Sequence, residues 1–291
     1  MTRTLITGGK IVDGAGNPWF MGDLLIEGET IAAIAPAESI DQATVDEVVD
    51  AAGHVVSPGF IDIQSHSIVP FLTDRRAISK VSQGGTTEIM GGGWTPSPFG
   101  GRVETPITPG LKRRIGDSYD EWVERAKGWT RFGDWLADLE SRGVSVNVGS
   151  FLGSGTLREF GRGQEMGPSS PDEMETMRRV MAEAMEDGAF GISYALIYPP
   201  ESYADTDELV EMLEDCDIYL TPYPNLQQAT SGTLSYAVAL GRAVISPPYI
   251  HARELLADTG GVLDGDLDQF MAAALAQKAF GGVPGQVEDV L

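Results

Sequence analysis

Short apolar runs alternate with glycine-containing turns over the first fifty residues. The dipeptides Gly8-Gly9, Asp13-Gly14 and Glu27-Gly28 separate these runs. Because β-prone runs bounded by such turns are typical of hairpins, the pattern predicts a small antiparallel sheet. Its expected strands are residues 5–7, 10–12, 23–26 and 30–34.

The pattern changes at about residue 55, where apolar strands end in small or polar residues and helical patterns follow them. This alternation is typical of βα units with a parallel sheet. The expected strands are residues 55–63, 86–90, 145–151 and 190–197.

One helix is predicted clearly, over residues 171–187. Ser170 and Glu173 form a capping-box pattern, Pro171 stands at the first helical position, and Gly188 follows the last turn. Methionines form a stripe on one face, which we expect to pack into the core. They are Met174, Met177, Met181 and Met185.

The last eighty residues predict a compact βαβα unit followed by one more helix. Its strands are expected at 217–223 and 243–246, and its helices at 230–240 and 250–257. Residues 266–280 form an amphipathic pattern, which predicts a terminal helix that packs on the rest of the chain.

Composition narrows the class of protein. Of the 291 residues, 42% are apolar and 22% are charged, so the chain is neither disordered nor fibrous. The formal net charge of −23 argues against nucleic acids and anionic membranes as partners. A single cysteine, Cys216, excludes an intramolecular disulfide. No membrane-spanning or signal-peptide pattern is present in this sequence, so we expect a soluble, cytoplasmic protein.

Residues 57–66, which read Ser-Pro-Gly-Phe-Ile-Asp-Ile-Gln-Ser-His, contain the strongest chemical signal. A buried strand ends here in polar side chains, at the end where parallel barrels place their chemistry. Residues two apart on a strand share a face, so Gln64 and His66 are expected to project into the same space. That spacing suits two ligands of one metal ion.

This segment resembles the opening of the metal site of the amidohydrolase superfamily, in which PGFID precedes x-H-x-H. Longer stretches are similar to the N-acyl-D-amino-acid deacylase (D-aminoacylase) branch, among them QGGTTEIMGGGWTPSP, NVGSFLGSGTLRE and MEDGAFGISYALIYPPESYADTDEL. The resemblance covers about residues 1–211. It implies a β-sandwich, a (β/α) barrel and zinc-dependent hydrolysis of an acylated D-amino acid, with metal-activated water and an aspartate base on a later strand.

The sequence also departs from that family. Gln64 replaces the first histidine of the pair, and the segment expected to contain a metal-bridging cysteine reads Gly-Gly-Gly-Trp over 91–94. The chain has three histidines, His54, His66 and His251. The family's further histidines and its aspartate come from later strands, beyond the resemblance, so the general base has no candidate.

Besides Gln64, four further residues are candidates for the site or its surroundings, namely His66, Glu88, Asp62 and Tyr198. His66 is predicted to bind the metal, or else to be a hydrogen-bonded histidine at a strand end. Glu88 is expected to complete or orient the site, or to be a satisfied polar residue. Asp62 is predicted to support the ligands rather than bind the metal. Tyr198 lies beyond a strand end and is expected to touch the substrate, whereas His54 is expected at the surface.

Residues 215–263 are similar to the sugar-nucleotide half of a family 4 glycosyltransferase. The helix start at Ser231-Gly232-Thr233 would then hold a diphosphate or simply cap the helix. The two acidic positions of that family's Glu-x7-Glu motif are Gln228 and Tyr236, and His251 stands at a helix start.

The sequence therefore predicts an α/β protein with three parts. These are a small N-terminal β-sandwich portion (1–54), a partial TIM-like (β/α) barrel (55–212) and a Rossmann-like βαβα unit with a terminal helix (213–291). The favoured function is a zinc-dependent hydrolase of N-acyl-D-amino acids with an incomplete site. A non-catalytic chimera joined near residue 212 and a nucleotide-sugar-binding module are the alternatives.

Overall fold

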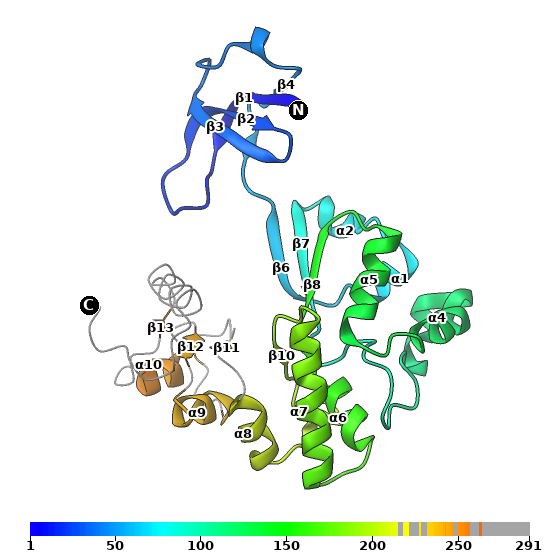
Figure 1. Cartoon of the computed structure of the whole chain (residues 1–291). Coiled ribbons are helices and arrows are strands. Elements are labelled where there is room, and N and C mark those ends of the chain that lie inside the picture. Colours follow the sequence, from blue (N-terminus) through cyan, green and yellow to red (C-terminus); the bar gives the residue numbers. More distant parts are fainter. Residues whose placement is uncertain are drawn as a thin grey trace. The chain divides into compact units, whose positions relative to one another are not determined.

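The computed structural model has a mixed α/β fold and describes residues 1–214, 218–220, 227, 232–241, 243–246, 249–256 and 262–263 (Figure 1). The chain divides into two compact units. The first contains Met1–Ile89 and Val144–Val148, and the second contains Met90–Gly143 and the chain from Gly149 onward. Within the described residues, no helix has both the length and the apolar character needed to cross a membrane.

The first unit begins with a five-stranded sheet in the order β3-β2-β1-β4, with β5 also paired to β1. The predicted antiparallel hairpins are confirmed for β1, β2 and β3, whereas β4 and β5 pair with β1 in parallel. The two runs predicted at 5–7 and 10–12 form one strand. The strands are β1 (Arg3–Ile11), β2 (Phe20–Glu27), β3 (Thr30–Pro36), β4 (Glu47–Asp50) and β5 (Val55–Val56).

Strand β1 continues through its glycine pair because a buried aspartate stabilises an irregularity there. The register with β2 shifts between Ile6 and Gly9, and Gly8 has a φ of +71°. Asp23 accepts hydrogen bonds from Thr7 Oγ1 at 2.7 Å and from the Gly8 N–H at 3.1 Å. The glycine pair is therefore a β-bulge inside a strand rather than a hairpin turn.

The next sheet has the order β6-β7-β8. The strand predicted at 55–63 is interrupted at Gly59, where an added Cβ would lie 2.0 Å from Thr86 Oγ1. Only glycine fits this close approach, and β6 begins after it and ends just before His66. The elements are β6 (Phe60–Ser65), α1 (Ile68–Thr73), α2 (Ile78–Val81), β7 (Gly85–Met90) and β8 (Asn147–Ser150).

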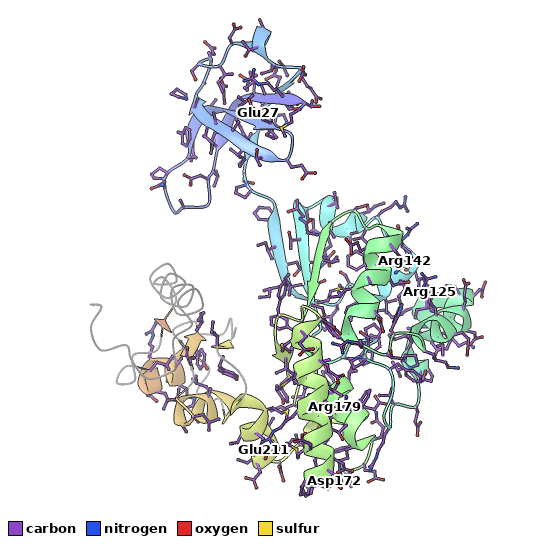
Figure 2. All side chains as sticks on the ribbon, viewed as in Figure 1. Glu27, Arg125, Arg142, Asp172, Arg179 and Glu211 are labelled. Carbon is purple, nitrogen blue, oxygen red and sulfur yellow. The ribbon has the colours of Figure 1, made fainter. Side chains whose placement is uncertain are left out.

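The helices between β7 and β8 are joined by a charged and aromatic cluster. Asp138 accepts hydrogen bonds from Arg125 Nε at 2.6 Å and Arg142 Nε at 2.7 Å. Both guanidinium groups lie over the Trp122 ring, and Figure 2 labels the two arginines. This cluster ties α4 to α5. The elements here are η2 (Pro109–Leu111), α3 (Lys112–Ile115), η3 (Gly116–Ser118), α4 (Tyr119–Ala126) and α5 (Phe132–Arg142).

The second unit also contains a short parallel pair, β9 and β10, and the helices α6, α7 and α8. The predicted helix is confirmed as α7, and both bonds of its capping box form between Ser170 and Glu173. Met174, Met177 and Met181 are buried, as predicted, whereas Met185 is only half-buried. The elements are β9 (Leu152–Gly153), α6 (Ser154–Arg162), α7 (Pro171–Glu186), β10 (Ile192–Ser193), η4 (Glu201–Tyr203) and α8 (Thr206–Glu214).

The strand predicted over 190–197 is wrong beyond Ser193. The Tyr198 N–H donates to the Ala195 carbonyl at 3.0 Å, so the chain turns where the apolar pattern predicted an extended strand. The strand predicted over 145–151 is likewise shorter, at Asn147–Ser150.

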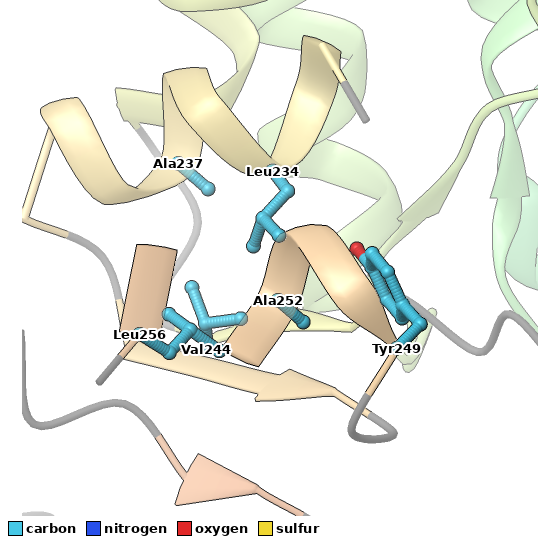
Figure 3. Packing of buried hydrophobic residues seen from close by; sticks show 6 residues of the cluster. All are labelled: Leu234, Ala237, Val244, Tyr249, Ala252 and Leu256. Carbon is cyan, nitrogen blue, oxygen red and sulfur yellow. The ribbon is translucent and has the colours of Figure 1, made fainter. Parts of the chain in front are cut away.

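The last described segments form a three-stranded parallel sheet in the order β11-β12-β13, with helices α9 and α10. Leu234, Ala237, Val244, Tyr249, Ala252 and Leu256 form its core (Figure 3). The strand predicted at 243–246 is confirmed, whereas Cys216 and the helix predicted at 266–280 lie outside the described residues. The elements are β11 (Ile218–Leu220), α9 (Gly232–Ala239), β12 (Ala243–Ser246), α10 (Ile250–Leu256) and β13 (Val262–Leu263).

Asp187 should make the stability of the second unit depend on pH. Hydrogen bonds from the Arg131 side chain, and then from the Gly133 N–H, hold the pKa of Asp187 below its ordinary value, although burial opposes them. A lowered carboxyl pKa stabilises the fold above the unfolded-state pKa of about 4, and this contribution disappears as pH falls through the lowered value. We therefore expect Asp187→Asn to lower the free energy of unfolding at pH 7 and to lower it less at acidic pH.

Urea denaturation at pH 7 and at about pH 2.5 measures this difference. The control is Asp120→Asn, because the Asp120 side chain is 80% exposed and should contribute little at either pH. If Asp187→Asn lowered the free energy of unfolding equally at both pH values, the proposed coupling between ionisation of Asp187 and stability would be contradicted.

Candidate functional site

His66 lies directly after β6 and is exposed, between two buried serines. The backbone of Gln64 belongs to β6, and its side chain lies outside the described residues. His66 is thus exposed directly after this strand.

Glu88 on β7 is fully buried and accepts a hydrogen bond from Ser65, one of the two serines that flank His66. Ser65 Oγ donates to Glu88 Oε2, and Ser67 Oγ lies 2.8 Å from Ser65 Oγ. Because a hydroxyl carries one proton, Ser67 is the donor to Ser65. The three side chains therefore form one hydrogen-bonded chain that ends at the carboxylate.

The other carboxylate oxygen of Glu88, Oε1, is buried and has no hydrogen-bond partner among the described residues. An unpaired carboxylate oxygen at a fully buried site is costly, so such an atom ordinarily has a water, an ion or a proton beside it. Glu88 Oε1 could therefore bind a further ligand, such as a metal ion or a water, near the end of β6.

Asp62 has a different environment. Its carboxylate forms an ion pair with Lys80 of α2, and both side chains are about one-third exposed. This pair fixes the outer part of β6 against α2. Exposed pairs of this kind contribute little to stability, about 0–1 kcal/mol.

The described residues do not by themselves fit a zinc ion. A structural or catalytic zinc takes at least three protein ligands, and among the described ranges no group of three His, Cys, Asp or Glu side chains is close enough to hold a metal. The His66 imidazole and the free oxygen of Glu88 are donors of suitable chemistry, but they do not make a complete ligand set.

Tyr198 belongs to the second unit, on the loop after β10. Its side chain is 61% exposed, and the neighbouring Ile197 is 79% exposed. The loop is ordered by backbone bonds, because Tyr198 donates to Ala195 and its own carbonyl accepts from the Ser202 N–H at 2.9 Å. The loop therefore presents an aromatic and an aliphatic side chain to solvent.

Glu201 follows this loop and is the functional candidate that the sequence pattern does not indicate. It is 4% exposed, and its Oε1 accepts from Ser154 Oγ and from the N–H groups of Gly155 and Ala195, each at 3.1 Å. Burial raises the pKa of Glu201, and these three hydrogen bonds oppose that rise. Its donors are six and about fifty residues away in sequence, so a local pattern does not reveal them.

The other histidines of the chain are His54 and His251. His54 is exposed in a turn and donates its N–H to the Ala51 carbonyl at 2.9 Å, as predicted for a surface residue. His251 is the second residue of α10, at the predicted helix start. Gln228 and Ser231 lie outside the described residues, as does the side chain of Tyr236.

Comparison with known proteins finds a D-aminoacylase and N-acyl-D-amino-acid deacylases among the similar sequences. No protein-family model matches the sequence. The chain is 30% identical to the D-aminoacylase of Alcaligenes xylosoxydans xylosoxydans over 257 residues, which cover 87% of this chain and 50% of that protein. It is 32% identical to the N-acyl-D-aspartate deacylase of the same organism over 211 residues, or 72% of this chain and 40% of that protein. The chain thus spans about half the length of the curated relatives it matches.

Solved structures give the same result for the fold. A D-aminoacylase structure from a study of its binuclear metal centre matches with a TM-score of 0.69 and 25% identity, over 96% of this chain and 56% of that one. The N-acyl-D-glutamate deacylase of Bordetella bronchiseptica, solved with zinc and a phosphonate inhibitor, matches with a TM-score of 0.67 and 21% identity, with the same two coverages. The mixed α/β fold is therefore similar to that of D-aminoacylases.

These matches do not support the glycosyltransferase resemblance of residues 215–263. The similarity to D-aminoacylases covers 87% of the sequence and 96% of the fold, which is more than residues 1–211 contain. It therefore continues past residue 212, and a junction of two unrelated folds there is not favoured. The prediction failed because a βαβα pattern is common to many α/β folds and does not distinguish between them.

Proposed function

We propose that this chain acts in the metal-dependent hydrolysis of the amide bond of N-acyl-D-amino acids. The observation that carries the proposal is the exposed His66, which directly follows β6, the strand that contains the end of the Pro-Gly-Phe-Ile-Asp segment. The similarity to a D-aminoacylase and to an N-acyl-D-aspartate deacylase supports the substrate class.

Zinc is the proposed ion, because a deacylase of similar fold was solved with it. In the proposal His66 binds the metal, and Gln64 and Glu88 complete or orient the site. Asp62 supports β6 through its pair with Lys80. The His66 imidazole and the free Glu88 oxygen support these roles by their chemistry.

Tyr198 is the proposed contact to the small acylated substrate. Its exposed ring and the adjacent Ile197 offer apolar surface of the kind that an acyl chain contacts. The backbone bonds at Ala195 and Ser202 support this role, since they hold the loop in one conformation before any ligand is present.

For the architecture, we propose that residues 55–212 form part of a (β/α) barrel. Residues 1–54 would then contribute to a β-sandwich, and 213–291 would supply a further βαβα unit. The strand order β6-β7-β8, in which consecutive strands are neighbours, supports the barrel because barrel strands follow one another in sequence order.

Zinc content tests the proposal directly. We expect the purified chain to bind zinc and His66→Ala to lose it, because imidazole is the strongest ligand in the set. His54→Ala is the matched control, since His54 is an exposed histidine of the same unit whose replacement should leave the zinc content unchanged. Elemental analysis of the three proteins gives the result.

An activity assay completes the test. Zinc-loaded protein should release amino acid from N-acetyl-D-aspartate or N-acetyl-D-glutamate and not from the L-enantiomers. Absence of zinc from the unmodified chain, or equal zinc in His66→Ala, would contradict the metal proposal. Zinc binding without release from any N-acyl-D-amino acid would contradict the proposed substrate.

A further inference from the structure

Glu201 joins three segments that are distant in sequence. The residue begins η4, directly after the loop that presents Tyr198. Its carboxylate reaches back to the Ala195 N–H at the start of that loop, and forward across space to Ser154 and Gly155 at the start of α6. One side chain thus closes the loop on itself and also fixes it to a helix.

We infer that Glu201 is the positioning residue for Tyr198 in the hydrolysis of N-acyl-D-amino acids, an inference that rests on the proposed function. The Glu201 side chain is buried, so its effect on the reaction is indirect. It acts through the loop of residues 195–200, whose exposed tip is Ile197 and Tyr198.

The charge of Glu201 is matched by hydrogen-bond donors rather than by a cation. None of the ion pairs in the described part of the chain includes Glu201. Its three donors all point to one oxygen, and two of them belong to the first turn of α6, where the helix dipole favours a negative group. Releasing the loop would leave these buried donors without partners, so the closed conformation is strongly favoured.

Close packing excludes other arrangements of the carboxylate. A Cβ added at Gly93 would lie 2.9 Å from Ala195 Cβ and 3.0 Å from Glu201 Oε2. A Cβ added at Gly155 would lie 2.9 Å from the Gly93 carbonyl oxygen and 3.3 Å from Glu201 Cγ. Glycines at both positions let the backbone approach, so the Glu201 side chain packs closely against these two segments.

The functional consequence is that the loop with the exposed Ile197 and Tyr198 is ordered before substrate binds. A loop with a 61% exposed tyrosine would ordinarily sample many conformations, and ligand binding would have to order it. With Glu201 in place that ordering precedes binding. If only a fraction of the molecules has the loop in the conformation that binds substrate, the apparent affinity for substrate falls in proportion to that fraction.

Two variants separate the carboxylate's hydrogen bonding from its charge. Glu201→Ala removes the acceptor, whereas Glu201→Gln keeps one carbonyl oxygen that can accept the same three donors. We expect Glu201→Ala to speed hydrogen exchange at the Ala195 and Tyr198 amides by at least about tenfold, with α7 amides unchanged. Glu201→Gln should restore most of the protection. Ser202→Ala, an exposed position in the same turn, is the matched control.

Kinetics then test whether the effect passes through Tyr198. For N-acetyl-D-glutamate, we expect Glu201→Ala to raise KM about tenfold with a smaller change in kcat. In the Tyr198→Ala background the same change should have little further effect, since a positioning residue has nothing left to position.

The outcomes are distinguishable. Equal exchange at Ala195 and Tyr198 in the unmodified chain and in Glu201→Ala would overturn the inference, whatever the activity. Additive effects of Tyr198→Ala and Glu201→Ala on KM would overturn it as well. An unmodified chain that hydrolyses no N-acyl-D-amino acid contradicts the proposed function, and with it the role of Glu201 in that reaction, while the exchange data still report whether the carboxylate holds the loop.

Discussion

Arg158→Met is expected to lower the free energy of unfolding by about 3–5 kcal/mol, because it leaves a buried carboxylate without its cation. Arg158 on α6 is 2% exposed and forms an ion pair with Glu208 on α8, which is 5% exposed. The guanidinium also donates to Ser169 Oγ at 3.2 Å and to the Gly167 carbonyl at 2.7 Å. The arginine therefore ties two helices and a loop together inside the second unit.

Two further variants separate the ion pair from the loss of a long side chain. Arg179, which Figure 2 labels, forms an exposed ion pair with Glu183 on α7. Arg179→Met should therefore lower the free energy of unfolding by less than about 0.5 kcal/mol. Arg158→Met combined with Glu208→Leu should recover much of the loss, because no buried charge remains unpaired. Urea titration followed by tryptophan fluorescence measures all three. Equal losses for Arg158→Met and the double variant would show that packing, not charge, dominates.

Elements with strong local signals are the ones that the sequence predicts well. Helix α7 begins at Pro171 because Ser170 and Glu173 satisfy each other's backbone N–H groups, and both partners are visible within four residues. The hairpins of β1, β2 and β3 follow from alternation and turns. In contrast, the parallel pairing of β4 to β1 joins residues more than forty apart, for which the sequence contains no local signal.

The loop after β10 shows why a local pattern can fail. Residues 190–197 are apolar enough for a buried strand, yet Ile197 is 79% exposed and the chain turns at Ala195. Glu201 stabilises that turn from outside the segment, through contacts to α6 that no window of sequence contains. Tertiary hydrogen bonds override the strand propensity here.

The same distinction applies to the candidate site. His66 could be found from sequence because it follows a recognisable strand end, and the structure leaves it exposed there. No motif marks the serines on either side of it, although their hydrogen-bonded chain to Glu88 gives that carboxylate its environment. The sequence does not indicate Glu201 either, since a lone glutamate has no motif.

Gly91→Ala is expected to lower the free energy of unfolding by about 2–5 kcal/mol, through strain and a steric clash together. Gly91 follows β7 with a φ of +90°, and an added Cβ would lie 2.0 Å from the Phe151 carbonyl oxygen. That carbonyl belongs to the backbone and cannot rotate away, and the Phe151 N–H is held by the Met90 carbonyl at 2.9 Å. The clash therefore has to displace the chain that leads into β9 and α6.

Gly188→Ala is the matched control, because Gly188 has a similar φ of +95° and no atom within 4 Å of an added Cβ. It should cost only the backbone strain, about 1–2 kcal/mol. The difference between the two variants in urea denaturation isolates the close approach at Phe151. Since α6 supplies the Ser154 and Gly155 donors of Glu201, we also expect Gly91→Ala, and not Gly188→Ala, to speed hydrogen exchange at the Ala195 amide. Equal losses of unfolding free energy in the two variants would show that the backbone at Gly91 moves away from Phe151 without cost. The close approach would then not help to hold the segment that leads to Ser154 and Gly155.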